Sequence, residues 1–418
     1  MAVLQVVITG GAGQIAYSLI PLIARGLVFG PGIQVSLRLL DIPPAAQALE
    51  GLAMEIQDSL FSTALEGVLA TTDDVQAFEG AQVAILLGGF PRKPGMQRGD
   101  LIAKNVGIMK RMGQVIDRHA SRDCKVLVVA NPAATNCLVL AANAPSLPRK
   151  NFTCLSRLDH DRMVGMLLKK ANSVLAAVPS ATMTHPQQRL LPSDVRGACV
   201  WGNHSDSQVP DASSVKFRVN GKWIPATTLL GDSAWLHHIP DVEATGAVAG
   251  VEKGLAERVR SRGAAVLGAR KLSSAMSAAN AAAAHLADWL CPSSPVKTVS
   301  MGVFTDGNPF GVPDGLVCSL PIRCGSLSSV GDGGWSFDSE MQLTEEVSKH
   351  LTASVAELQD EWDMAMGVLS GGQGMAGGDP HASVPSMVAN GVNGLANGSA
   401  NGVAKGAMRI EHQPISSL

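Results

Sequence analysis

The chain lacks an excess of charge of either sign. Its 33 lysines and arginines nearly balance 35 aspartates and glutamates, which leaves a net charge of -2 over 418 residues. Binding to nucleic acid or to an anionic membrane needs an extended basic surface, so neither partner is expected and any basic site must be local. No uncharged apolar run approaches the ~18 residues that a membrane helix requires. The hydrophobic fraction of 46% predicts a globular protein with buried cores.

Cysteine patterns typical of metal sites or disulfide frameworks are also missing. The seven cysteines are odd in number and scattered, without CxxC spacing and without a neighbouring histidine cluster. This argues against a structural zinc site and predicts no metal, with buried free thiols in a reducing compartment. The N-terminus begins with a strand pattern and has no leader, so the cytoplasm is the expected location. The terminal Ser416, Ser417 and Leu418 resemble a peroxisomal signal only loosely, which makes that destination the minor alternative.

Residues 1–150 alternate short apolar runs with amphipathic stretches. The runs VLQVVIT, VSLRLLD, AQVAILLGG and KVLVVANPA predict buried parallel strands, and QIAYSLIPLIARG and AAQALEGLAMEIQDS predict helices between them. This alternation predicts an α/β fold with a Rossmann-type doubly wound parallel sheet.

Residues 151–369 have a less regular pattern, which predicts an α+β substrate-binding and catalytic domain. VKFRVNGKWIP predicts a hairpin around Asn220 and Gly221, residues 250–290 are helix-forming throughout, and VKTVSMGVFTDGNPFGVPDGLVCSLPI predicts two further strands. Apolar residues at helical spacing predict a long amphipathic helix over 342–369. From residue 370 to 418 the composition becomes rich in Gly, Ala, Asn and Ser, which predicts a disordered tail. Its sequon at Asn397 is not expected to carry a sugar.

The segment TGGAGQIA carries the spacing GxGxxA, with Gly11, Gly13 and Ala16, between a predicted strand and a predicted helix. Glycine allows a tight turn and the close approach of a pyrophosphate, and the helix N-terminus favours the phosphate charge. Asp41 ends the second predicted strand, where a carboxylate accepts hydrogen bonds from the ribose hydroxyls and repels a 2′-phosphate. NAD is therefore the expected cofactor. The spacing from Ala16 to Asp41 exceeds the usual ~20 residues, which predicts a longer connection.

The loop GGFPRKPGMQRGD, residues 88–100, carries two arginines, Arg92 and Arg98. Its Pro and Gly residues predict a segment that is neither helix nor strand, and arginine holds a carboxylate in two parallel hydrogen bonds. The alternative is a solvated basic turn. Further along, SRLDHDR places Asp159 and Arg162 one helical turn apart, and WGNHS supplies His204. A histidine of near-neutral pKa is suited to carry the proton of an alcohol oxidation, with a carboxylate to fix its tautomer.

Together these motifs resemble those of the lactate/malate dehydrogenase family, specifically malate dehydrogenases of the cytosolic type. The resemblance rests on TGGAGQIAYSL, LLDIPPAAQALEG, GFPRKPGMQR, NPAATNCL, CLSRLDHDR, WGNHS and ARKLSSAMSAANA, and covers about residues 3–366. It implies a homodimer that binds NAD in the first domain and reversibly oxidises (S)-malate to oxaloacetate.

The resemblance also implies the role of each site residue. His204 would be the acid/base, Asp159 its orienting partner, and Arg98 the group that polarises the carbonyl. Arg162 would bind one substrate carboxylate and Arg92 the other, with Asn131 and Ser274 beside the substrate. The cofactor would lie against Gly10, Gly11, Ala12, Gly13, Gln14, Ile15, Ala16, Asp41, Asn105, Val129, Ala130 and Asn131.

Two departures from the family pattern stand out. Ala134 replaces the inner Asn of NPANTN, and the stretch PSATMTHPQQRLLPSD is an insertion whose His185 is not expected to catalyse. Two alternative functions remain open: a dehydrogenase for another 2-hydroxy acid, and a dinucleotide-binding protein that has lost catalysis. Retention of the full set of His204, Asp159 and the arginines argues against the second alternative.

Overall fold

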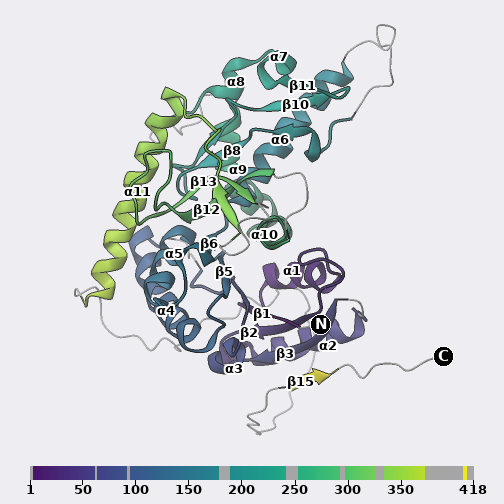
Figure 1. Ribbon diagram of the computed structural model, residues 1–418, viewed down its shortest axis with the longest axis vertical. Coiled ribbons are helices and arrows are strands. Elements are labelled where there is room, and N and C mark those ends of the chain that lie inside the picture. The colour runs from purple at the N-terminus through teal and green to yellow at the C-terminus, as the bar shows by residue number, and fades with distance from the viewer. Residues whose placement is uncertain are drawn as a thin grey trace, which may run out of the picture.

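The computed structural model describes residues 3–61, 64–91, 95–177, 189–241, 253–291, 297–324, 334–371 and 408–411. Six parallel strands form the nucleotide-binding half of a ten-stranded sheet, in the order β3-β2-β1-β4-β5-β6 (Figure 1). This is the order of a doubly wound dinucleotide-binding sheet, with its switch point between β1 and β4. The strands are β1 (Leu4–Thr9), β2 (Val35–Leu40), β3 (Leu65–Thr71), β4 (Val83–Leu86), β5 (Lys125–Val128) and β6 (Phe152–Cys154).

Burial and strand length explain why the sequence predicted four of these strands and missed two. Val83–Leu86 is buried at every position, as expected for a central strand covered on both faces. By contrast, Leu65–Thr71 contains Gly67 and a partly exposed pattern, and Phe152–Cys154 is only three residues long. The predicted first domain ends at residue 150, just before β6.

Helices cover both faces of the parallel sheet. α1 packs against α10, and α4 packs against α5 and α11 (Figure 1). The helices of the first half are α1 (Gln14–Ala24), α2 (Ala46–Asp58), α3 (Asp74–Phe78), α4 (Arg98–His119) and α5 (Ala133–Ala142).

The second half extends the same sheet with antiparallel strands. β12 (Lys297–Phe304) joins β6, and β13 (Val317–Cys324) and β14 (Trp335–Phe337) follow outward. The two strands predicted for this region are thus confirmed. Small antiparallel sheets are formed by β7 (Val195–Arg196), β10 (Lys216–Val219) and β11 (Lys222–Pro225), and by β8 (Cys199–Trp201) and β9 (Val209–Asp211).

The predicted hairpin is confirmed because β10 and β11 pair across the Asn-Gly turn. Asn220 and Gly221 both have positive φ, 48° and 78°, as a two-residue hairpin turn of this kind requires.

The helices of the second half are α6 (Arg157–Ala176), α7 (Ala226–Leu230), α8 (Ser233–His237), α9 (Leu255–Arg270), α10 (Met276–Leu290) and α11 (Glu345–Leu369). The prediction of continuous helix-forming sequence over 250–290 is wrong at Lys271–Ala275, which separate α9 from α10. Lys271 adopts the left-handed conformation at φ 60° and ends α9. The predicted C-terminal amphipathic helix is confirmed as α11, which begins after Thr344, whose side chain accepts a hydrogen bond from the Val347 amide.

The predicted tail begins at the end of α11, and four of its residues, Met408–Glu411, form β15, which pairs antiparallel with β3. Residues 372–407 and 412–418 of the tail, as well as His185, lie outside the described residues. Six of the seven cysteines are buried and all are free thiols, whereas Cys291 is exposed.

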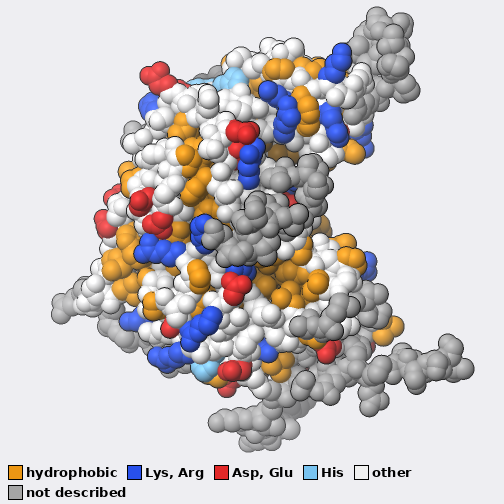
Figure 2. All heavy atoms as spheres, viewed as in Figure 1, with side chains coloured by type: hydrophobic (Ala, Val, Ile, Leu, Met, Phe, Trp, Pro, Cys, Tyr) orange, Lys and Arg blue, Asp and Glu red, His pale blue; other side chains and the backbone are white. Residues whose placement is uncertain are grey.

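Charges of both signs are interspersed over the face shown in Figure 2. Within the described part of the chain, no helix combines the length and apolar character needed to cross a bilayer. The same residues contain no cluster of His, Cys, Asp or Glu arranged to hold a metal ion.

Candidate active site

The glycine-rich turn lies at the carboxyl end of β1, directly beside the end of β4. Gly10 has φ 65°, and a Cβ on it would stand 2.8 Å from the backbone nitrogen of Gly88. A side chain is therefore excluded on steric grounds, and the two backbones approach as closely as a dinucleotide turn requires. α1 starts directly after Gly13, and no side chain caps its start. Its first amides are thus available to a phosphate.

Asp41 follows β2 and faces this turn. Its carboxylate accepts a hydrogen bond of 3.0 Å from the Ala12 amide and one of 2.8 Å from the Ile42 amide. The turn and the carboxylate therefore form one unit, although β1 and β2 are separated by a helix and the long connection that the spacing predicted. Ala16, in the first turn of α1, is fully buried, as the close packing of helix and strand demands. The residues present fit a dinucleotide.

Asn105 is fully buried on α4, and its side-chain amide bonds to the backbone of neighbouring segments. Its Oδ1 accepts from the Phe90 amide at 2.9 Å, and its Nδ2 donates to the Leu101 carbonyl at 3.0 Å. In this arrangement Asn105 holds the start of the arginine loop, and its contact with a cofactor stays a prediction. Val129, Ala130 and Asn131 follow β5 at the same edge of the sheet, with a cis bond between Asn131 and Pro132.

The tertiary structure brings the three motifs of the predicted chemistry together. α6 carries Asp159 in its first turn, and the carboxylate is 1% exposed. Its Oδ2 bonds to Nδ1 of His204, and its Oδ1 accepts from Nη1 of Arg162 at 2.9 Å. Arg162 also donates through Nη2 to the Ser274 hydroxyl at 3.2 Å. One buried carboxylate thus orients both the imidazole and the guanidinium.

The charges around His204 and Asp159 shift the pKa of each. The Asp159 carboxylate raises the pKa of His204 above its ordinary value, although burial, Arg162 and Arg98 oppose this shift. Burial raises the pKa of Asp159, but His204 and Arg162 outweigh that effect and hold it below its ordinary value. The imidazole is therefore tuned by a fixed anion, with its side chain 25% exposed. By contrast, burial lowers the pKa of His160, which follows Asp159 on α6, to about 3, so this imidazole does not carry a proton near neutral pH.

Arg98 differs from its predicted setting, because it is the first residue of α4 and does not lie in the irregular loop. Gln97 caps this helix, and its backbone amide donates to the carboxylate of Asp100 in a capping box. Because of this cap, α4 begins at Arg98, within the segment 88–100 that was predicted to be an irregular loop. Arg92 lies outside the described residues.

Glu361 on α11 is a buried polar residue that the sequence did not single out. Its side chain is 2% exposed and accepts hydrogen bonds from Arg98 Nε at 2.7 Å and from Asn203 Nδ2 at 2.8 Å. It also accepts from the hydroxyl of Thr135 in the NPAATN motif. The available signal was an acidic residue on the apolar face of a predicted amphipathic helix, three residues after buried Leu358.

Comparison with known proteins identifies the family. Residues 4–153 match the lactate/malate dehydrogenase NAD binding domain, and residues 181–368 match the lactate/malate dehydrogenase alpha/beta C-terminal domain. The chain therefore belongs to the lactate/malate dehydrogenase family.

Within that family, the chain is similar in sequence to malate dehydrogenases. It is 42% identical over 366 residues to malate dehydrogenase 1, cytoplasmic, of Arabidopsis thaliana, covering 88% of this chain and 98% of the relative. It is 41% identical, with the same coverage, to the cytoplasmic malate dehydrogenase of Zea mays.

Solved structures give the same fold. Malate dehydrogenase from Naegleria fowleri superposes with a TM-score of 0.73 at 34% identity, over 88% of this chain and 99% of that one. Trichomonas vaginalis lactate dehydrogenase in complex with NADH and oxamate superposes with a TM-score of 0.74 at 32% identity and the same coverage.

Proposed function

We propose that this protein is an NAD-dependent dehydrogenase that reversibly oxidises (S)-malate to oxaloacetate in the cytoplasm. The observation that carries the proposal is the single buried carboxylate of Asp159, which holds His204 and Arg162 at once. A general base and a carboxylate-binding guanidinium in fixed relation are what a 2-hydroxy acid requires.

In this proposal His204 exchanges the proton of the substrate hydroxyl. With Nδ1 bonded to Asp159, the opposite nitrogen, Nε2, is left to accept the hydroxyl proton of malate. Asp159 also stabilises the imidazolium that results, which is the effect that raises the pKa of His204. In the reverse direction the protonated imidazole returns the proton to the carbonyl oxygen of oxaloacetate. NAD, when bound, supplies the nicotinamide ring that accepts the hydride from the carbon carrying the hydroxyl.

The substrate carboxylates are assigned to the arginines. Arg162, whose side chain is 12% exposed and already oriented by Asp159 and Ser274, binds the carboxylate next to the reacting carbon as a bidentate pair. Arg98 polarises the carbonyl from the start of α4, which is supported by its electrostatic influence on His204. Arg92 is assigned to the distal carboxylate, and Asn131 to the substrate and the nicotinamide side.

The cofactor is assigned to the turn Gly10–Ala16 with Asp41, Val129 and Ala130 around it. The carboxylate of Asp41, directly after β2, would accept hydrogen bonds from the ribose hydroxyls and repel a 2′-phosphate, so NAD is favoured over NADP. Steady-state rates with malate and with lactate, each with NAD and with NADP, test the proposal. We expect turnover with malate and NAD to exceed the other three combinations, and folded protein inactive with that pair would refute the function.

A second function, oxidation of another 2-hydroxy acid, is favoured by one observation, namely the similarity to a lactate dehydrogenase structure.

Arg92 distinguishes oxidation of malate from oxidation of another 2-hydroxy acid. We expect Arg92→Gln to lower kcat/KM for oxaloacetate by about 10²-fold, the loss of one charge-assisted pair, while pyruvate is unaffected. Rates for both ketoacids measure this. The control is Arg111→Gln. Arg111 lies on α4 and pairs with Asp74 on α3, so its loss should change the rate with neither ketoacid. Equal losses for the two ketoacids would contradict the role of Arg92.

A homodimer is also proposed. Large apolar side chains are exposed on α1, on α2 and at the start of α10, namely Tyr17 at 53%, Met54 at 53% and Met276 at 78%. α1 packs against α10, and Tyr17 on α1 is hydrogen-bonded to Glu55 on α2, so the three helices are neighbours and their exposed apolar side chains suit contact with a second copy. Sedimentation equilibrium should give twice the 43.3 kDa of the single chain.

A further inference from the structure

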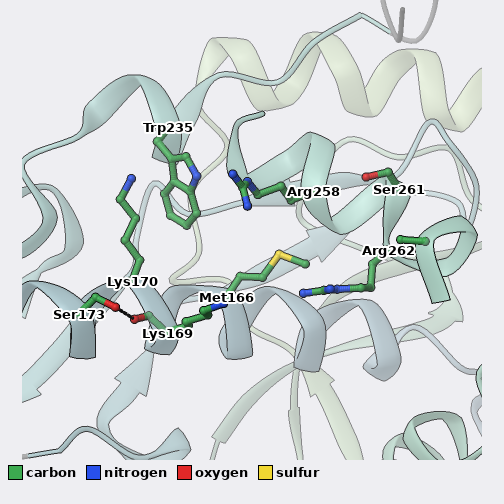
Figure 3. A pocket seen from close by; sticks show the side chains of 9 residues that line it. Met166, Lys169, Lys170, Ser173, Trp235, Arg258, Ser261 and Arg262 are labelled. Atoms are coloured by element: carbon green, nitrogen blue, oxygen red, sulfur yellow. Dashed lines mark hydrogen bonds between the residues drawn. The ribbon is translucent and has the colours of Figure 1, made fainter. Parts of the chain in front are cut away.

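A cavity lies in the catalytic half of the molecule, between α6, α8 and α9 (Figure 3). Its volume is about 390 Å³. α6 contributes Lys169 and Lys170, α9 contributes Arg258, Ser261 and Arg262, and α8 contributes Trp235. Helical spacing explains why one face of α9 lines it, since residues 258, 261, 262 and 265 recur at intervals of three and four.

The walls of this cavity are strongly basic. Four of the nine lining residues are lysine or arginine and none is acidic. Lys170 is neutralised by Asp232 at 2.7 Å, and its ammonium lies 4.3 Å from the centre of the Trp235 ring. In the part of the chain that the structure describes, the side chains of Lys169 and Arg262 make no ion pair or hydrogen bond. Two cations thus face the same space without a counter-charge, in a chain whose overall charge is close to neutral.

We propose that this cavity binds a small polyanion through Lys169 and Arg262, with Trp235 as an apolar wall. The volume accommodates a metabolite with two or three phosphate or carboxylate groups and is too small for a nucleic acid or a folded partner. Arginine presents a planar pair of donors to such a group, and lysine adds a point charge.

This cavity is separate from the proposed substrate site. Arg162 lies about 10 Å along α6 from Lys169 at 1.5 Å per residue. On α9 the residue next to the Arg162 guanidinium is Gly263, where a Cβ would stand 3.8 Å from it. Gly263 is absent from the cavity lining, so α9 presents different faces to the two sites.

Calorimetric titration of the full-length protein with pyrophosphate, at constant ionic strength, tests the site. Inorganic phosphate and a tricarboxylate in parallel titrations separate the two anion chemistries. We expect the double variant Lys169→Ala/Arg262→Ala to raise the Kd for the better probe at least about tenfold. The matched control, Lys216→Ala/Lys222→Ala, removes two exposed cations from the hairpin of the same half and should leave the Kd unchanged.

Arg162→Lys distinguishes binding in the substrate site from binding in the cavity. Pyrophosphate binding that persists in Arg162→Lys and is lost in Lys169→Ala/Arg262→Ala supports the cavity. Binding lost in Arg162→Lys, weakened equally by the hairpin control, or absent for all three probes overturns the proposal. Because the readout is binding, failure of the proposed dehydrogenase activity would not affect it.

A different observation, the set of contacts made by Glu361, carries a second inference. The carboxylate joins three segments that each border the candidate active site: Arg98 at the start of α4, Thr135 on α5, and Asn203, which precedes His204. A buried anion with three donors from three segments is well satisfied and restricts all of them. We infer that Glu361 is a positioning residue, which sets where Arg98 stands relative to His204. This inference rests on the proposed function.

Glu361→Gln tests this role because it keeps the size of the side chain and removes its charge. We expect kcat for oxaloacetate reduction to fall about 10-fold to 10²-fold with the KM for NADH unchanged. His204 is faced by Asp159, Arg162 and Arg98. With the Arg98 charge no longer compensated, the pKa of His204 falls, and the pH profile of kcat moves to lower pH.

Two variants make this test specific. Glu361→Asp retains the charge, so its pH profile should stay close to that of the unmodified protein. Asp360→Asn alters an exposed carboxylate on the same helix and should change neither kcat nor the profile. Lower thermal stability of Glu361→Gln with unchanged kcat and profile would overturn the inference. An unmodified protein without activity on malate would instead refute the proposed function.

Discussion

Replacing Asp159 with Asn is expected to lower kcat by about 10³- to 10⁴-fold, the magnitude known for the same change in another histidine–carboxylate pair. The amide of Asn donates as well as accepts, so it no longer requires the proton on Nδ1 of His204. The wrong tautomer leaves Nε2 protonated and unable to accept the hydroxyl proton of malate. Loss of the buried charge also frees Arg162, which bonds to the same carboxylate. Steady-state rates of malate oxidation measure the effect.

The pH dependence of the remaining activity gives a second measurement on this variant. Malate oxidation needs the neutral imidazole, so kcat/KM rises with pH through the pKa of His204. In the unmodified protein the Asp159 charge holds that pKa above its ordinary value. Without it the pKa falls, because desolvation, Arg162 and Arg98 all lower it. The rise for malate and the decline for oxaloacetate reduction should therefore both move to lower pH.

Asp161→Asn is the matched control for Asp159→Asn. It lies on the same helix but pairs with Arg157 at 2.9 Å, away from His204. Its kcat should stay close to that of the unmodified protein. A value for Asp159→Asn within tenfold of the unmodified protein, in a variant with unchanged thermal stability, would show that His204 does not depend on this carboxylate.

Replacing Arg162 with Lys is expected to lower kcat/KM for oxaloacetate by about 10²- to 10³-fold, although the charge is kept. Lysine cannot form the two parallel hydrogen bonds of a guanidinium, and it cannot reach Asp159 and Ser274 together as Nη1 and Nη2 do. The loss corresponds to breaking a buried charge-assisted pair. Most of it should appear as a higher KM, because the carboxylate is bound in the ground state as well as in the transition state.

Arg218→Lys provides the comparison for Arg162→Lys. Arg218 on β10 is 44% exposed, pairs with Asp194 at 2.8 Å and lies over the Trp223 ring, and neither partner belongs to the proposed site. Its kinetics should be those of the unmodified protein. If Arg162→Lys retains the KM of the unmodified protein, a different group binds the first carboxylate.

The local parts of the nucleotide site could be predicted from the sequence, because they depend on short segments. A tight turn between a strand and a helix needs glycine at fixed spacing, and the structure places Gly10–Ala16 in that setting. Asp41 comes directly after its strand, as expected, and its carboxylate accepts a hydrogen bond from the Ala12 amide. The hairpin at Asn220 and the amphipathic α11 follow from equally local rules.

Other features could not be predicted, since their signals are weak or their partners are distant. β6 is too short for a periodicity, and the break after α9 depends on one residue, Lys271, in a conformation that its neighbours do not specify. The early start of α4 at Arg98 came from its cap, a signal that the loop composition concealed.

The sequence by itself determined the family and four of the six parallel strands, and it singled out His204, Asp159 and Arg162, because each of these lies in a short motif whose chemistry is local. Only the tertiary structure decided which groups share a carboxylate. Glu361 meets Arg98 across 263 positions of the chain, and Ser274 meets Arg162 across 112. Likewise, the basic cavity exists only where α6 and α9 pack. Such contacts depend on how helices and strands pack in space, and packing is not encoded in any one segment.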